Sequence, residues 1–171
     1  MVVADRGYAA LTLDAVGAAA GVSKGGVLYH FPTKEALVAA LVEDLAAGFE
    51  ADQRAAYDAD RTGPGAWTRA YLTASSTPPP SESEQMAVVA LLAAVGYDPS
   101  LLQPIQERYR TWVERLDGDG LAGVDAHVVR LAADGLWAAD LFGLAPPDAE
   151  LRAGIHTRLV QLASASGGQR R

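Results

Sequence analysis

The chain has 171 residues, 50% of them hydrophobic, and no cysteine, so it can bury a substantial core but cannot form a disulfide, a thiolate metal site or a cysteine nucleophile. Its 14 basic and 21 acidic side chains give a net charge of −7, which argues against a protein that coats nucleic acid through a global positive field. Charged residues or prolines interrupt every apolar stretch, and the N-terminus lacks a basic segment followed by an apolar one. We therefore expect a cytoplasmic chain without a membrane span or signal peptide, whose contacts with any nucleic acid are local.

The hydrophobic periodicity is helical throughout, which predicts an all-α fold. In the first third of the chain we expect helices at residues 1–6, 13–20, 24–30 and 34–56. Hydroxyl side chains stand where three of these helices begin, as N-caps require: Thr12, Ser23 and Thr33. Glycines at positions 7 and 21 follow the expected helices 1–6 and 13–20, and a glycine in the left-handed conformation commonly ends a helix.

Five further helices are expected in the rest of the chain. They lie around residues 67–72 and at residues 84–95, 99–116, 124–142 and 148–163. Segments rich in glycine, proline, serine or aspartate separate them, at residues 59–65, 75–83, 117–120 and 143–147. The segment 84–95 is strongly apolar, which predicts a central place in a helical bundle.

Residues 12–34 carry the most specific pattern in the sequence. A capped short helix, a turn at residues 21–23 and a second short helix that ends at an aromatic residue match the spacing of a helix-turn-helix. The second helix of that motif enters the DNA major groove, and Gly25 and Gly26 near its start would permit close approach. Lys24, Tyr29, His30 and Lys34 supply hydrogen-bond donors, and no acidic residue lies between positions 21 and 34.

The string from Leu11 to Leu37, LTLDAVGAAAGVSKGGVLYHFPTKEAL, resembles the DNA-binding signature of the tetracycline-repressor-like (TetR/AcrR) bacterial transcription regulators. The register of Tyr29, Phe31 and Lys34 after Gly21 carries much of this resemblance. It covers roughly residues 1–45, and beyond them that family shares an all-helical domain. The resemblance therefore implies a helix-turn-helix DNA-binding domain at residues 1–45 and a helical-bundle domain for ligand binding and dimerisation at residues 46–171.

The resemblance also implies which residues bind double-stranded operator DNA: Thr12, Ser23, Lys24, Gly25, Gly26, Tyr29, His30 and Lys34. The two hydroxyl residues would cap their helices and reach phosphates, while residues 24–26 would face base edges. Tyr29, His30 and Lys34 would bind phosphates, with His30 also able to reach a base. The implied small core of this domain is Val16, Ala20, Val22, Val27, Phe31 and Leu37.

The first helix departs from the family pattern, because only about six residues precede Gly7 where the family has a longer helix with a basic approach to DNA. Residues 1–50 contain three basic and six acidic side chains, a net charge of −3. We therefore expect weak non-specific affinity and a steep dependence on dimerisation. An alternative is that the chain is a DNA-binding-impaired fragment of such a regulator.

Aromatic and sulfur-containing side chains at helical spacing could line a pocket for a small hydrophobic effector of unknown identity, or could form the core: Trp67, Tyr71, Met86, Tyr109, Trp112 and Trp137. Asp134 and Asp140 flank Trp137 and could meet a polar ligand or lie at a surface or interface. The helices Val124–Phe142 and Asp148–Ala163 resemble the dimerisation pair of the family, although the same surface could bind a foreign partner.

The sequence lacks a glycine-rich phosphate loop, a His-Glu-x-x-His pair and a Gly-x-Ser-x-Gly elbow, so we expect neither an enzyme nor a cofactor or metal. The leading prediction is a ligand-responsive repressor that binds a pseudo-palindromic operator as a homodimer and is released by its effector. The alternative outside this class is a helical protein interaction module. In that case Tyr29 and His30 would be packing residues and Lys24 and Lys34 would be solvated surface charges.

Overall fold

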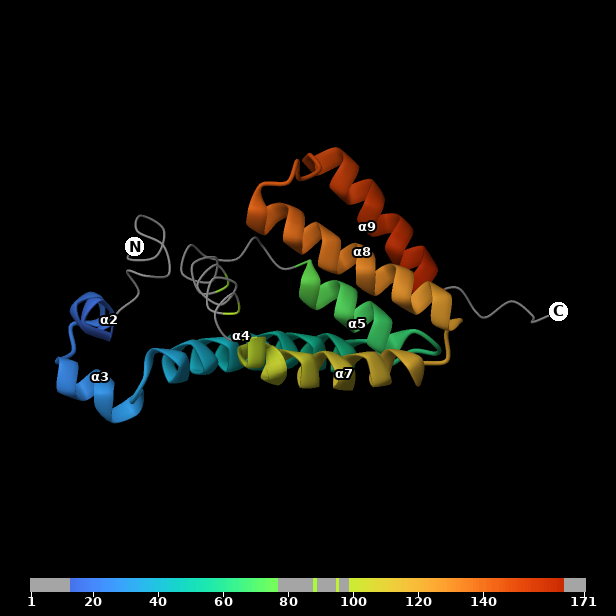
Figure 1. The fold of residues 1–171 in the computed structure, drawn as a ribbon. Coiled ribbons are helices and arrows are strands. Elements are labelled where there is room, and N and C mark those ends of the chain that lie inside the picture. Colours follow the sequence, from blue (N-terminus) through green and yellow to red (C-terminus); the bar gives the residue numbers. More distant parts are fainter. Residues whose placement is uncertain (1–12, 77–87, 89–94, 96–98, 165–171) are drawn as a thin grey trace. The chain divides into compact units, whose positions relative to one another are not determined.

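The computed structural model describes residues 13–76, 88, 95 and 99–164 (Figure 1). Every regular element in these residues is helical, which confirms the predicted all-α fold class. The elements are α2 (Leu13–Ala20), α3 (Lys24–His30), α4 (Lys34–Ala59), α5 (Ala66–Ser75), the 3-10 helix η2 (Pro99–Leu102), α7 (Gln103–Asp117), α8 (Gly123–Phe142) and α9 (Ala149–Ser164). None of the described helices is both long and apolar enough to cross a membrane.

Two features differ from the sequence-based expectation. The helix α4 continues to Ala59, about one turn beyond the expected end. The helix expected to begin at Pro99 starts as a 3-10 turn, and the α-helix α7 begins only at Gln103. The predicted helix at residues 1–6 lies outside the described residues, as do Thr12 and Met86, and of the predicted helix 84–95 only Val88 and Val95 are described, both of them helical.

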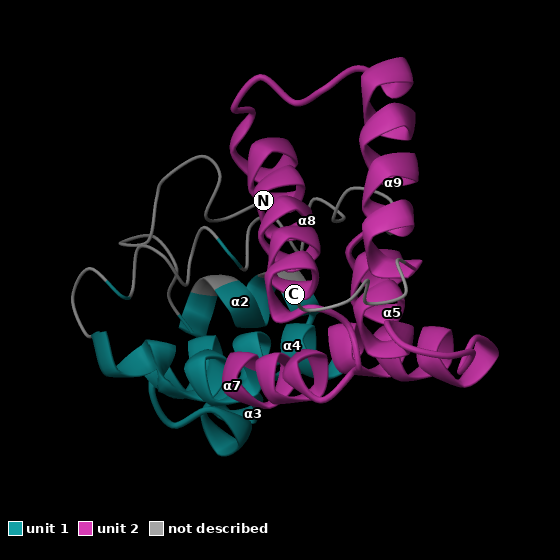
Figure 2. Cartoon of the chain, turned by 90° about the vertical axis from the view of Figure 1, so that its right-hand side faces the viewer, with its two compact units in different colours: residues 1–47, 80–108 teal, residues 48–79, 109–171 magenta. Residues whose placement is uncertain are grey.

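The chain forms two compact units, residues 1–47 with 80–108 and residues 48–79 with 109–171 (Figure 2). In the first unit, Val38 and Val42 of α4 form the centre of the core, with exposed fractions of 1% and 3%. Partly buried apolar side chains from α2, η2, α7 and position 95 pack against them: Val16, Leu101, Ile105 and Val95. This core attaches α2, and with it the turn that leads into α3, to the N-terminal half of α4.

The second unit is built around α5, which packs against α8 and α9. Tyr71 and Leu72 of α5 are almost completely buried, as are Ala126 and Val129 of α8. Small residues on α8 allow close approach of the two helices, and the large apolar side chains then fill the space between them. The result is a helical core that surrounds the middle of α5.

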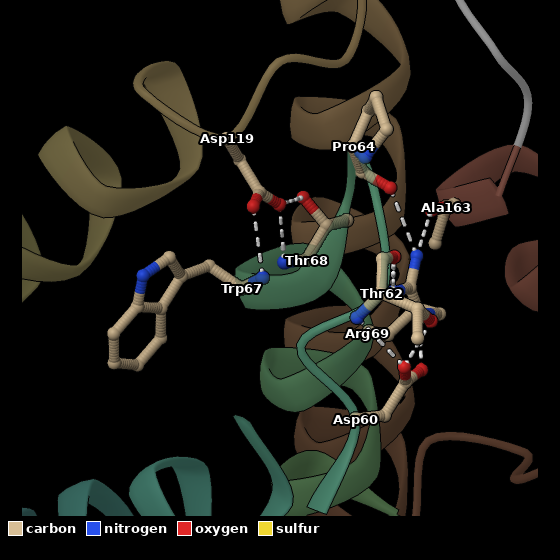
Figure 3. Close-up of polar contacts among 8 residues, drawn as sticks. All are labelled: Asp60, Thr62, Pro64, Trp67, Thr68, Arg69, Asp119 and Ala163. Carbon is tan, nitrogen blue, oxygen red and sulfur yellow. Dashed lines mark hydrogen bonds and ion pairs between the residues drawn. The ribbon is translucent and has the colours of Figure 1, made fainter. Parts of the chain in front are cut away.

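Asp119, in the loop after α7, holds the start of α5. Its carboxylate accepts hydrogen bonds from the backbone N–H groups of Trp67 (2.9 Å) and Thr68 (2.7 Å) and from the Thr68 hydroxyl (2.8 Å) (Figure 3). Because the first N–H groups of a helix lack internal partners and carry partial positive charge, a buried carboxylate at this place is strongly favoured. The N-terminal end of α5 is therefore fixed by a residue about fifty positions away.

Arg69 fastens the loop before α5 to the end of α9. Its guanidinium donates hydrogen bonds to the carboxylate of Asp60 and to the carbonyl oxygens of Thr62, Pro64 and Ala163 (Figure 3). Hydrogen bonds from Thr62 and then from Arg69 lower the pKa of Asp60 to about 2. Gly65 completes the arrangement, because it has a φ of +86° and a Cβ there would lie 2.0 Å from the Ala163 carbonyl oxygen.

Candidate nucleic-acid interface

The helix α3 begins at Ser23, as the sequence predicts. Ser23 has extended backbone angles (φ −66°, ψ 154°), and its Oγ accepts a hydrogen bond from the Gly26 N–H at 3.2 Å. Its carbonyl oxygen accepts a further bond from the Val27 N–H at 3.1 Å. The cap therefore fixes the first turn of α3, which carries Lys24, Gly25 and Gly26.

The turn between α2 and α3 depends on two glycines. Gly21 has a φ of +67°, a conformation that L side chains rarely adopt, and it ends α2. Gly17 lies where the two helices approach, because a Cβ there would be 2.9 Å from the Val22 carbonyl oxygen and 3.2 Å from Val27 Cγ2. A side chain at position 17 would push α3 away from α2, so glycine sets the spacing of the motif. Sequence reasoning did not identify this role of Gly17.

The outer face of α3 is open. Ser23, Lys24, Gly25 and His30 are exposed, and Tyr29 is 85% exposed. Among the described residues, a Cβ at Gly25 would have only the Ser23 Oγ as a neighbour, at 4.0 Å. The ring of Tyr29 meets that of His30 edge to face, with centroids 5.1 Å apart. The face thus combines a narrow first turn with hydrogen-bond donors at both ends, which is the geometry that a major groove accepts.

Lys24 forms an ion pair with Asp14 of α2, with its Nζ 2.8 Å from Asp14 Oδ2. The two side chains are 63% and 60% exposed, and ion pairs of that kind stabilise a fold by only about 0–1 kcal/mol. The pair therefore places Lys24 beside the turn. Because the pair is weak, the Lys24 ammonium group can exchange Asp14 for a phosphate or a base at little cost. Sequence reasoning did not identify this pair, whose two residues lie ten positions apart.

Lys34 stands at the first position of α4, next to the cap residue Thr33, whose Oγ1 accepts a hydrogen bond from the Ala36 N–H at 3.1 Å. Desolvation by partial burial lowers the pKa of Lys34, and the neighbouring charge of Glu35 opposes this shift. A lysine at a helix N-terminus, where the helix dipole is positive, forms a site that favours an anion such as a phosphate.

The expected core of this region is confirmed in part. Val27 and Leu37 are buried, with exposed fractions of 6% and 5%, and Val16 and Phe31 are half-buried. Val22 is 50% exposed and Ala20 is exposed, so their assignment to the core was wrong. The physical reason is the turn itself, which directs the Val22 backbone carbonyl, and not its side chain, towards Gly17.

The structure brings together three of the six residues expected to bind a ligand. The rings of Tyr71, Tyr109 and Trp112 form a cluster with Phe49, in which Phe49 lies 5.3 Å from Tyr71 and 4.8 Å from Trp112, centroid to centroid. Trp67 instead stacks on Tyr57 at 3.9 Å, and Trp137 on α8 is 39% exposed. The cluster lies at the centre of the second unit, and its Tyr71 and Trp112 are buried, with exposed fractions of 2% and 3%.

Two family patterns match the chain. Residues 1–41 match the family described as bacterial regulatory proteins, tetR family, and residues 65–164 match the tetracyclin repressor-like C-terminal domain. The second match alone covers more than half of the sequence. The chain belongs to the tetR family. Neither a search of curated proteins nor a search of solved structures finds a match to it.

Membership of the tetR family makes this protein a DNA-binding transcriptional regulator with an N-terminal helix-turn-helix and a C-terminal helical domain. The N-terminal match includes the whole exposed face of α3 and the start of α4. TetR-family regulators are generally not enzymes, in keeping with the sequence-based expectation.

Proposed function

We propose that this tetR-family regulator is a repressor that binds a pseudo-palindromic operator as a homodimer and is released by a small hydrophobic effector in the cytoplasm. The observation that carries the proposal is the open face of α3, where an unobstructed glycine turn is flanked by Lys24 and by the strongly exposed Tyr29. In this proposal residues 1–45 bind DNA, and residues 46–171 bind the effector and form the dimer.

The DNA contacts follow from position on α3 and α4. Lys24, Gly25 and Gly26 lie in the first turn of α3 and face the base edges, because the N-terminal residues of a recognition helix contact bases. Tyr29 and His30, at the other end of the helix, donate to phosphates, as Lys34 does at the start of α4. Thr12 and Ser23 add phosphate contacts at the starts of their helices.

The proposed dimer interface uses α8 and α9. Exposed apolar side chains follow one face of α8: Val124 is 75%, Val128 43%, Leu131 58% and Phe142 46% exposed. Leu151 and Val160 of α9 are also exposed, and Arg152 forms an ion pair with Asp140 of α8 at 2.5 Å. A second copy of the same surface would bury this stripe in a closed two-fold contact.

In this proposal, effector binding releases the repressor from DNA through α4, which is one continuous helix. It carries Lys34 at its start and, further along, Phe49 and Gln53 in the core of the second unit. The two recognition helices of a dimer must lie about 34–36 Å apart, or a small multiple of this, to reach successive major grooves. An effector that shifts α4 changes this spacing. Operator and effector must then weaken each other's binding by the same factor.

Selection of bound fragments from a random double-stranded DNA library tests the proposal. We expect an inverted repeat to be enriched, with half-site centres about 10–10.5 base pairs apart or a multiple of this. Leu131→Glu, on the exposed stripe, should give a monomeric mass and lose the repeat, whereas Ala51→Glu, on the exposed side of α4, should change neither. No enrichment, or enrichment of a single half-site by a monomer, would contradict the proposal.

A further inference from the structure

The aromatic core of the second unit contains a linked set of polar groups. The Tyr71 hydroxyl donates a hydrogen bond to Asp134 Oδ1 at 2.5 Å, and Arg130 Nη1 donates to Asp134 Oδ2 at 3.1 Å. The Tyr109 hydroxyl lies close enough to Tyr71 and Asp134 for both to influence its pKa, which burial raises. The helices α5, α7 and α8 each contribute to this set, which lies against the ring of Trp112.

Three buried donors in the same core have no acceptor in the part of the chain that the structure describes: Trp112 Nε1, Gln53 Nε2 and Arg130 Nε. Trp112 is 3% exposed and Gln53 is 2% exposed. Gln53 lies one helical turn after Phe49 on α4, and the rings of Phe49 and Trp112 are in contact. A buried donor without a partner is costly, so three in one core point to an acceptor that the described residues do not supply.

The electrostatics of the core favour an uncharged acceptor. The guanidinium of Arg130 is already paired with the carboxylate of Asp134, and their side chains are only 18% and 26% exposed. Burial raises the pKa of Asp134, and burial also raises the pKa of Tyr71 and Tyr109. The core therefore resists added negative charge, and a carboxylate there would be costly to desolvate.

We propose that the effector is an uncharged aromatic molecule with a carbonyl-type acceptor oxygen, which accepts a hydrogen bond from Trp112 Nε1 in the core of α4, α5, α7 and α8. The rings of Phe49, Tyr71 and Trp112 already meet edge to face, and an aromatic ligand extends that arrangement. Gln53 Nε2 and Arg130 Nε are the other two buried donors of this core that lack a partner among the described residues. This inference rests on the proposed effector response and narrows its chemistry.

Three small probes of nearly the same shape test the inference: acetophenone, α-methylstyrene, in which the carbonyl is replaced by a methylene, and benzoate. Their binding to the full chain is followed through the indole N–H resonances in ¹⁵N-correlated spectra, with Trp112 assigned by the peak missing from Trp112→Phe. We expect acetophenone to move the Trp112 resonance saturably, with a Kd about tenfold below that of α-methylstyrene. Tenfold corresponds to about 1.4 kcal/mol, one net hydrogen bond. Benzoate should bind more weakly than acetophenone.

Equal affinity for acetophenone and α-methylstyrene, tighter binding of benzoate, or an unmoved Trp112 resonance would overturn the inference. Any of these results would indicate that bound water or the protein itself satisfies the buried donors. Trp112→Phe should abolish the preference for the ketone, whereas Trp67→Phe, at the ring stacked on Tyr57, should preserve it. Should Trp112→Phe fail to fold, Arg130→Lys replaces it, because it keeps a charge beside Asp134 and should reduce the preference.

Operator binding, measured on the same preparation, separates this inference from the proposed function. Specific operator binding without a preference for the ketone overturns the effector chemistry and leaves the repressor proposal intact. A ketone preference without any operator binding supports the ligand site and contradicts the repressor proposal.

Discussion

Replacing Gly25 by alanine should stabilise the isolated protein and weaken its binding to operator DNA. Gly25 lies in the first turn of α3, and it is not among the residues with positive φ. In the part of the chain that the structure describes, a Cβ at this position would meet only the Ser23 Oγ, at 4.0 Å. Alanine therefore fits the free protein without strain, and any loss of DNA binding must come from the face that the methyl group occupies.

The two effects have magnitudes that the structure allows us to set. Glycine in a helix costs about 0.5–1 kcal/mol relative to alanine, and no clash at position 25 reduces the gain from replacing it. A methyl group forced into a packed interface costs about 1–3 kcal/mol, and a dimer carries two. Operator affinity should thus fall by roughly 30-fold or more, since about 2 kcal/mol is the lower limit of the combined penalty.

Urea unfolding measures the first effect and fluorescence anisotropy with labelled operator the second. Gly48→Ala is the matched control, because a Cβ at that position of α4 meets no atom of the described residues within 4 Å. This substitution should stabilise the fold without changing DNA binding. Gly17→Ala should destabilise the fold, because its Cβ would lie 2.9 Å from a backbone oxygen. Operator affinity of Gly25→Ala within twofold of the parent would refute the reasoning that places this turn against the bases.

Three further substitutions have expected outcomes. Lys34→Ala should weaken binding to all DNA sequences alike and lower the salt slope by about one unit, and a loss confined to one sequence would argue against a phosphate contact. Asp14→Asn should release Lys24 and raise DNA affinity about two- to fivefold. The free energy of unfolding should change by less than about 1 kcal/mol, because the ion pair is exposed. Weaker DNA binding would instead show that the ion pair holds Lys24 in a position that favours DNA contact. Asp119→Ala should lower the free energy of unfolding by about 3 kcal/mol, because it leaves three donors at the start of α5 without their acceptor. Asp117 is exposed, so the control Asp117→Ala should change the free energy of unfolding by about 0.5 kcal/mol or less in the same urea titration.

The local parts of the fold were predictable from the sequence, because their determinants lie within a few residues of each other. The hydroxyl of Ser23 and the glycine at position 21 determine where α3 begins and α2 ends, and both act on neighbouring backbone groups. The same holds for Asp148, whose carboxylate accepts a hydrogen bond from the Leu151 N–H at the start of α9. Helix existence and the exposed face of α3 follow from such short-range signals.

Long-range contacts were not predictable, because nothing in the local pattern specifies the partner. Asp119 reads as part of a glycine-rich turn, yet it caps a helix some fifty residues earlier in the chain. Asp134 was assigned either to a ligand or to a surface, whereas its partners are the buried Tyr71 and Arg130. The closeness of Gly17 to Val22 and Val27 likewise depends on how two helices pack, which spacing alone does not determine.

The most direct test of the account is a fluorescence-anisotropy titration of the chain against the intergenic DNA upstream of its own gene, with a scrambled duplex of the same composition as control, both at physiological salt. The account predicts tighter binding to the upstream DNA by about 10³-fold or more, as specific regulators show over non-specific DNA. Equal weak binding to the two duplexes, or none, would contradict the claim that α3 of this chain recognises an operator.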